Sequence, residues 1–92
     1  MKMKKFSLKE AKKVGDKLRV SWKDFDARQF RDGMNVELEH GTVHKETNIT
    51  NDNPIMTGKI ALAHLNEFHD YYYRLEKLEK EAKKYWRQKK KP

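Results

Sequence analysis

With 92 residues, the chain is long enough for one folded domain and too short for two. It contains no cysteine, which excludes disulfide bonds and thiolate zinc sites and favours a reducing cytoplasm as the place of action. No segment approaches the roughly 20 consecutive apolar residues that span a bilayer, so we expect no contact with a membrane.

Charge is distributed unevenly along the chain, whose net charge is +8. Residues 1–23 contain nine Lys and Arg against two acids, residues 24–70 contain four against nine, and residues 71–92 contain nine against three. Both ends are therefore basic and the middle is acidic. This layout fits two interpretations, lysine-rich solvated helix faces or a surface that binds a charged partner.

The first predicted helix begins at a capping box. Ser7 can accept a backbone N–H while Glu10, three residues later, reaches back to the start of the helix. Apolar residues then recur at helical spacing, which predicts a helix over 8–19. Trp22 and Phe25 follow in the connection and are expected to hold it against the core.

The second predicted helix has the same kind of start. Asp26 and Gln29 form another capping box, and the apolar residues after it predict a helix over 27–40. Gly41 is expected to end this helix in the left-handed conformation that glycine adopts most easily.

A long loop rich in turn-forming residues separates this part from the last two predicted helices. Asn53 before Pro54 is a cap followed by proline at the first helical position, which predicts a helix over 54–68. Asp70 can cap a further helix over 70–89. The sequence leaves open whether these two helices form one long, bent helix. The predicted apolar stripe of the last helix consists of Tyr71, Leu75, Leu78, Ala82, Tyr85 and Trp86.

These elements together predict a single all-α domain over 1–92, a compact bundle of three or four helices. The basic ends, 1–6 and 89–92, are expected to be frayed.

Two mirrored acid–imidazole steps are the candidate functional site. Glu37 and His40 lie three residues apart on the second predicted helix, and His64 and Glu67 lie three apart on the third. Residues three apart share a helix side, so two antiparallel helices would bring both pairs to one point. Two imidazoles and two carboxylates suit one divalent ion, zinc, iron or manganese.

A buried hydrogen-bonded network is the alternative interpretation of the same residues. His64 falls within the apolar arc of its helix, and an unpartnered polar group there would be unfavourable by several kcal/mol. Either a metal or a partner such as Glu37 can satisfy it. Asp70 and Tyr71 are candidates to support the site from behind, although a helix cap and a core tyrosine explain them equally.

Basic residues on the first and last predicted helices form a second candidate site, for nucleic-acid phosphates or an acidic protein. Tyr73 lies on the basic side of the last helix and could stack on a base. The charged members are Lys9, Lys12, Lys13, Lys17, Arg74, Lys77, Lys80, Lys84 and Arg87.

Several blocks of the chain resemble a small uncharacterised family of phages and bacteria that carries only a domain-of-unknown-function label. They include Glu37-Leu38-Glu39-His40-Gly41, which reads E-x-E-H-G, and residues 64–72, which read H-L-x-E-x-x-D-Y-Y. His69 departs from the proline expected in relatives and favours continuity of the last two helices. The resemblance implies a prokaryotic or phage setting, with roles in virion assembly or in blocking host factors or defences, and no established activity.

We therefore expect a small binding protein rather than an enzyme, since no serine, threonine or glycine pattern supports nucleophilic catalysis or phosphate cradling. The leading hypothesis is a divalent-metal or polar His/Glu site between the second and third predicted helices. The alternative is a basic interaction module. A homodimer is compatible with both.

Overall fold

The computed structural model describes residues 5–89 and contains only helices and loops over this range. The elements in chain order are α1 (Leu8–Lys17), α2 (Ala27–Glu37), the 3₁₀ turns η1 (Leu38–His40) and η2 (Lys45–Thr47), α3 (Pro54–Glu67) and α4 (Tyr71–Lys89). The chain is an all-α helical bundle, as the sequence predicted. The expected fraying falls mainly on 1–4 and 90–92, which lie outside the described residues; within the described range, Phe6 is buried rather than frayed.

The two capping boxes are confirmed, because both reciprocal bonds are present at each. The Glu10 backbone donates to the Ser7 hydroxyl over 3.1 Å, and the Gln29 backbone donates to the Asp26 carboxylate over 2.8 Å. The predicted end of the first helix at residue 19 is wrong by two residues. Arg19 adopts a left-handed φ of 59°, which is incompatible with α-helix, so α1 ends at Lys17.

The predicted end of the second helix also needs correction. α2 is α-helical to Glu37 and tightens into the 3₁₀ turn η1 over 38–40. Gly41 has a φ of −103°, so the expected left-handed glycine is wrong. The left-handed residues of this region are Asn51 and Asp52 in the following loop. The His40 carbonyl holds that loop by accepting from the backbone N–H of residues 49 and 50.

α3 and α4 are separate helices, so a continuous bent helix is wrong. α3 begins as predicted, with the Asn53 side chain accepting from the Met56 N–H and Pro54 at its first position. It ends at Glu67 because Phe68 is extended, with φ −141° and ψ 126°. A turn at His69 then redirects the chain, closed by a bond of 2.9 Å from the Tyr71 N–H to the Phe68 carbonyl.

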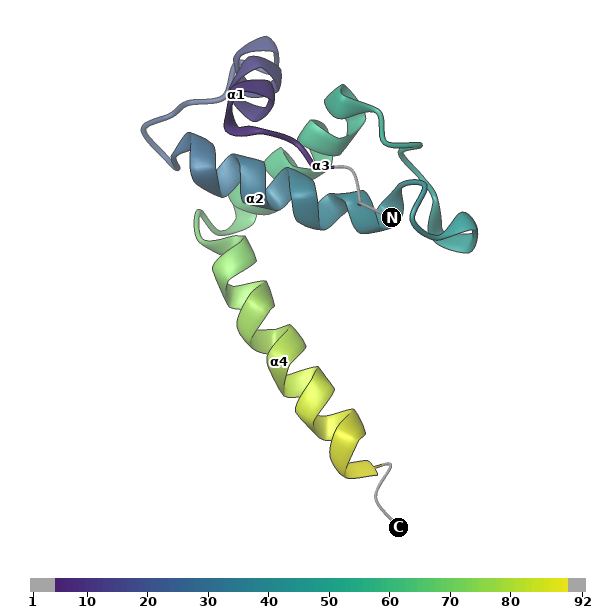
Figure 1. The fold of residues 1–92 in the computed structure, drawn as a ribbon. Helices are drawn as coiled ribbons and strands as arrows, with labels where there is room; N and C mark the ends of the chain where they lie inside the picture. Colours follow the sequence, from purple (N-terminus) through teal and green to yellow (C-terminus); the bar gives the residue numbers. More distant parts are fainter. Residues whose placement is uncertain (1–4, 90–92) are drawn as a thin grey trace.

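The core lies where α1, α2 and α3 meet (Figure 1). Phe30 and Met34 of α2 are fully buried, as are Ala61 and Leu65 of α3. Phe25 and Trp22 in the connection after α1 pack against Phe30, so they hold this connection as expected. Burial of these side chains supplies the main favourable free energy of folding.

α4 packs on the other helices only through its first turns and then extends away from them (Figure 1). Tyr72 is its buried side chain, and Tyr71 and Leu75 are half-buried. Leu78, Tyr85 and Trp86 are 59%, 51% and 61% exposed, so the expectation that the whole apolar stripe faces the core is wrong. The described part of the molecule consequently measures 51 × 28 × 20 Å. None of its helices is both long and apolar enough to span a membrane.

Candidate functional site

Glu37 and His64 meet between α2 and α3. The Glu37 Oε2 and His64 Nδ1 atoms lie 3.1 Å apart, and the Glu37 side chain is only 5% exposed. Glu37 occupies the last turn of α2 and His64 the last turn of α3, each on the side of its helix that carries the core residues. The helical phase that placed these two residues together in the sequence is thus realised in the fold.

Tyr72 completes a three-residue cluster with them. Its hydroxyl donates to Glu37 Oε2 over 2.7 Å and lies 3.1 Å from His64 Nδ1. A proton on Nδ1 can be shared between the Glu37 carboxylate and the Tyr72 oxygen, so one oxygen of Glu37 joins three helices. We call Glu37, His64 and Tyr72 the polar triad.

The sequence reasoning missed Tyr72 because Tyr71 and Tyr72 are adjacent and either can begin the apolar stripe of α4. The fold selects Tyr72 through a gap on α2. A Cβ added at Gly33 would lie 2.8 Å from the Tyr72 Cδ2 atom and closer still to Cε2. A glycine one helical turn before Glu37, on the same helix side, was the signal that could have located the tyrosine.

Tyr71 and Asp70, the candidates for supporting the site, have different positions. The Tyr71 ring stacks on the His64 imidazole with 4.4 Å between centroids and 5° between planes, so it fixes the orientation of that ring. The Asp70 carboxylate instead accepts from Arg74 Nε over 2.7 Å. This bond to Arg74 lowers the pKa of Asp70.

The electrostatics of the polar triad keep Tyr72 in its protonated form. Burial raises the pKa of Tyr72 far above its usual value, and its hydrogen bond to Glu37 raises it further. The phenol is therefore a permanent donor to the carboxylate at neutral pH. Over the described residues, no buried side-chain polar atom lacks a hydrogen-bond partner, so the network is satisfied by the protein alone.

His40 and Glu67, the outer members of the two predicted pairs, are exposed. Glu67 ends α3 and His40 lies in η1, where its backbone carbonyl, rather than its ring, makes the contacts that hold the loop. In the part of the chain that the structure describes, no three His, Cys, Asp or Glu side chains are arranged to hold one metal ion. The structure thus joins Glu37 to His64 and leaves the other two apart.

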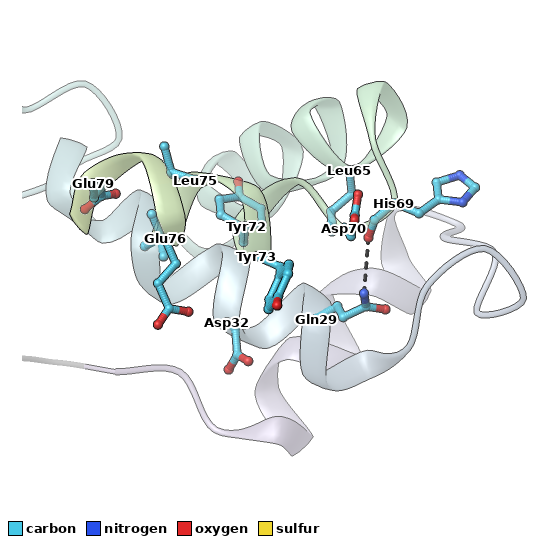
Figure 2. Close-up of a pocket in the computed structure, with 11 residues that line it drawn as sticks. Gln29, Asp32, Leu65, His69, Asp70, Tyr72, Tyr73, Leu75, Glu76 and Glu79 are labelled. Carbon is cyan, nitrogen blue, oxygen red and sulfur yellow. Dashed lines mark hydrogen bonds between the residues drawn. The ribbon is translucent and has the colours of Figure 1, made fainter. Parts of the chain in front are cut away.

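A groove of about 580 Å³ opens on the other side of Tyr72, between α2 and α4 (Figure 2). Leu65, Tyr72 and Leu75 line its apolar part. One end is closed by a bond of 3.2 Å from the Gln29 amide to the His69 carbonyl. The groove has an acidic rim, formed by Asp32, Asp70, Glu76 and Glu79.

The exposed length of α4 carries the basic residues of the second candidate site. Tyr73, Lys77, Lys80, Lys84 and Arg87 follow each other at spacings of four and three, so they form one side of the helix, which we call the basic face. All five are exposed, and the Lys77 ammonium lies 4.7 Å from the centroid of the Tyr73 ring.

Arg74 is used locally, since its guanidinium pairs with Asp70 and covers the Phe68 ring at 4.3 Å. The predicted lysines of α1 are also exposed, on the first helix rather than on the projecting one. They are Lys9, Lys12, Lys13 and Lys17.

Comparison with known proteins identifies the family. Residues 11–81 match the family model described as Protein of unknown function (DUF5661), which covers most of the chain, and the chain therefore belongs to this uncharacterised family. Neither the curated proteins nor the solved structures that were compared contain a match to the chain.

Proposed function

We propose that this member of the DUF5661 family is a non-catalytic binding protein that docks on nucleic-acid phosphates through the basic face of α4. The observation that carries the proposal is the run of four cations, at spacings of three and four, on a helix that projects from the globule. Because the other helices do not cover this length of α4, the whole face is open to an extended polyanion.

The charges of the basic face suit a phosphate backbone. Neighbouring cations on it are about 5 Å apart along the axis, from the helical rise of ~1.5 Å per residue. Lysines there act as point charges that release counterions from the nucleic acid. Of these cations, Lys80 has an acidic neighbour on its own helix, Glu76 at 3.4 Å, an exposed pair that a phosphate can replace.

Tyr73 provides an aromatic surface at the start of the basic face. It is 61% exposed, and base stacking on such a ring is worth about 1–3 kcal/mol without sequence preference. A basic face with an adjacent aromatic ring is typical of proteins that bind single strands through backbone charge and stacking. We therefore propose single-stranded DNA or RNA as the preferred form.

The experiment is a titration of a labelled single-stranded oligonucleotide by fluorescence anisotropy at two salt concentrations. Lys77→Glu/Lys84→Glu is expected to weaken binding at low salt by more than about tenfold, and to reduce the salt slope by about 2, one for each lost phosphate contact. Lys45→Glu/Lys59→Glu is the matched control, because it makes the same charge change on exposed lysines away from α4.

Equal losses in both variants would mean that net charge, rather than the basic face, attracts the oligonucleotide. No binding by the natural protein even at low salt would end the proposal and favour an acidic protein as the partner. In either case the proposed setting is the cytoplasm of a bacterium or of a phage-infected host. Blocking a host factor or defence, or associating with the virion, are the roles that fit that setting.

A divalent-metal site at the polar triad is the second candidate function. The meeting of the Glu37 and His64 side chains at 3.1 Å favours it, since a carboxylate and an imidazole are common ligands of zinc, iron and manganese. Elemental analysis of the purified protein tests it. Stoichiometric metal that is absent from His64→Ala would support the site, and a blank in the natural protein would leave a purely hydrogen-bonded network.

A further inference from the structure

The side of α4 opposite the basic face is apolar and uncovered. Leu75, Leu78, Ala82 and Tyr85 follow at spacings of three, four and three, the pattern of helices that pair side by side. Trp86 lies beside them, and we call these five residues the apolar face. Leu78, Tyr85 and Trp86 are each more than half exposed, at 59%, 51% and 61%. Apolar surface of this extent on a projecting helix favours a protein partner.

We propose that a second copy of this chain covers the apolar face, with the two α4 helices packed antiparallel about a two-fold axis. A two-fold contact needs one patch that is complementary to itself. The apolar face meets this condition because its leucines lie near the globule and its two aromatic residues near the tip. In an antiparallel pair, each leucine end therefore receives the aromatic end of the other copy.

Charge selects the antiparallel orientation. The first part of the projecting helix contains Glu76, Glu79 and Glu81, whereas the part over 83–89 contains four cations and no acid. Antiparallel packing brings each acidic part near the basic part of the other copy. Parallel packing would place the two basic parts together, which is unfavourable.

The groove between α2 and α4 supplies the remaining contact. If Leu78 packs opposite Ala82 of the second copy, the Trp86 side chain of that copy comes level with Tyr72 and Leu75, at the groove (Figure 2). A volume of about 580 Å³ is ample for an indole ring. The acidic rim at Glu79 then lies near Lys83 of the second copy. Groove and aromatic tip are thus complementary parts of one molecule.

The first test is the molar mass of the natural protein in solution over a range of concentrations, by sedimentation equilibrium. A monomer–dimer equilibrium is expected, and Leu78→Glu should raise its dissociation constant by more than about tenfold, because it buries a charge in the pairing surface. Gln88→Glu is the matched control, since it adds the same charge to α4 outside the apolar face. Circular dichroism shows whether the helices of both variants are retained.

The second test determines orientation and uses the absence of cysteine from the chain. Leu78→Cys and Ala82→Cys are oxidised separately and as an equimolar mixture. The proposal expects disulfide-linked dimers mainly in the mixture, because residue 78 faces residue 82 of the other copy. Efficient linking of either variant alone would indicate parallel packing and overturn the proposal, as would a monomer at every concentration. Neither result affects the basic face, which lies on the opposite side of α4.

Discussion

Glu37 is the residue on which three elements of the molecule depend. Its Oε2 atom accepts from the Tyr72 hydroxyl of α4 and lies within hydrogen-bond distance of His64 of α3. A carboxylate that is 5% exposed needs such partners, because burying it alone would be strongly unfavourable. The polar triad thus fixes how α3 and α4 attach to the end of α2.

Removal of one hydroxyl from the polar triad is expected to destabilise the fold. Tyr72→Phe keeps the ring packed against Gly33 but leaves the Glu37 carboxylate without its shortest hydrogen bond, so the free energy of unfolding should fall by about 1–3 kcal/mol. Urea denaturation measures this change. Tyr73→Phe removes the same group from an exposed neighbour and should have almost no effect; equal effects would contradict the structural role of the triad.

The raised pKa of Tyr72 predicts a loss of stability at alkaline pH. Its folded-state pKa lies above the ordinary value of 10.0, so its contribution is fully present below about pH 10 and declines as pH rises further. The unfolded chain then ionises this phenol while the folded chain keeps it protonated. Urea midpoints measured from pH 8 to 11 should fall less steeply in Tyr72→Phe than in Tyr73→Phe. Parallel curves would contradict the prediction.

At the scale of elements, helix starts and helix ends were decided by different forces. Ser7 and Asp26 begin α1 and α2 through contacts within three residues of the same chain segment. The end of α1 depends instead on Arg19, whose left-handed backbone accompanies the turn toward the packed Trp22. A local pattern carries no information on that packing, which explains why starts were predicted better than ends.

The contact between α2 and α4 predicts an exception to helix propensity at Gly33. Alanine is normally favoured over glycine inside a helix by up to about 1 kcal/mol. Here the added methyl group would overlap the Tyr72 ring, 2.8 Å from its Cδ2 atom, and displace α4. Gly33→Ala should therefore lower the free energy of unfolding by about 1–3 kcal/mol. A stabilised variant in thermal denaturation would show that α4 does not pack closely there.

At the scale of the whole molecule, the projecting helix has two functional sides. The basic face and the apolar face lie on opposite sides of α4, so pairing through one leaves the other open. A dimer would present two basic faces to one strand and bind it more tightly than a monomer by avidity.

If both proposals hold, a variant that only prevents pairing should also weaken nucleic-acid binding. Leu78→Glu is expected to bind a long oligonucleotide several-fold more weakly than Gln88→Glu does at protein concentrations where the dimer predominates. Far below those concentrations the two should bind alike, because both are then monomers. Anisotropy titrations at two protein concentration ranges measure this difference, and equal affinities throughout would separate pairing from binding.

The sequence by itself determined the all-α class, the starts of the helices and the approach of Glu37 to His64. Each of these depends on local caps or on the phase of a helix, which short-range geometry imposes. The tertiary structure alone decided that Tyr72 rather than Tyr71 joins the pair, that Phe68 separates α3 from α4, and that the stripe after Leu75 stays uncovered. These outcomes depend on the space that distant segments leave, such as the gap at Gly33, and no neighbouring residue encodes that space.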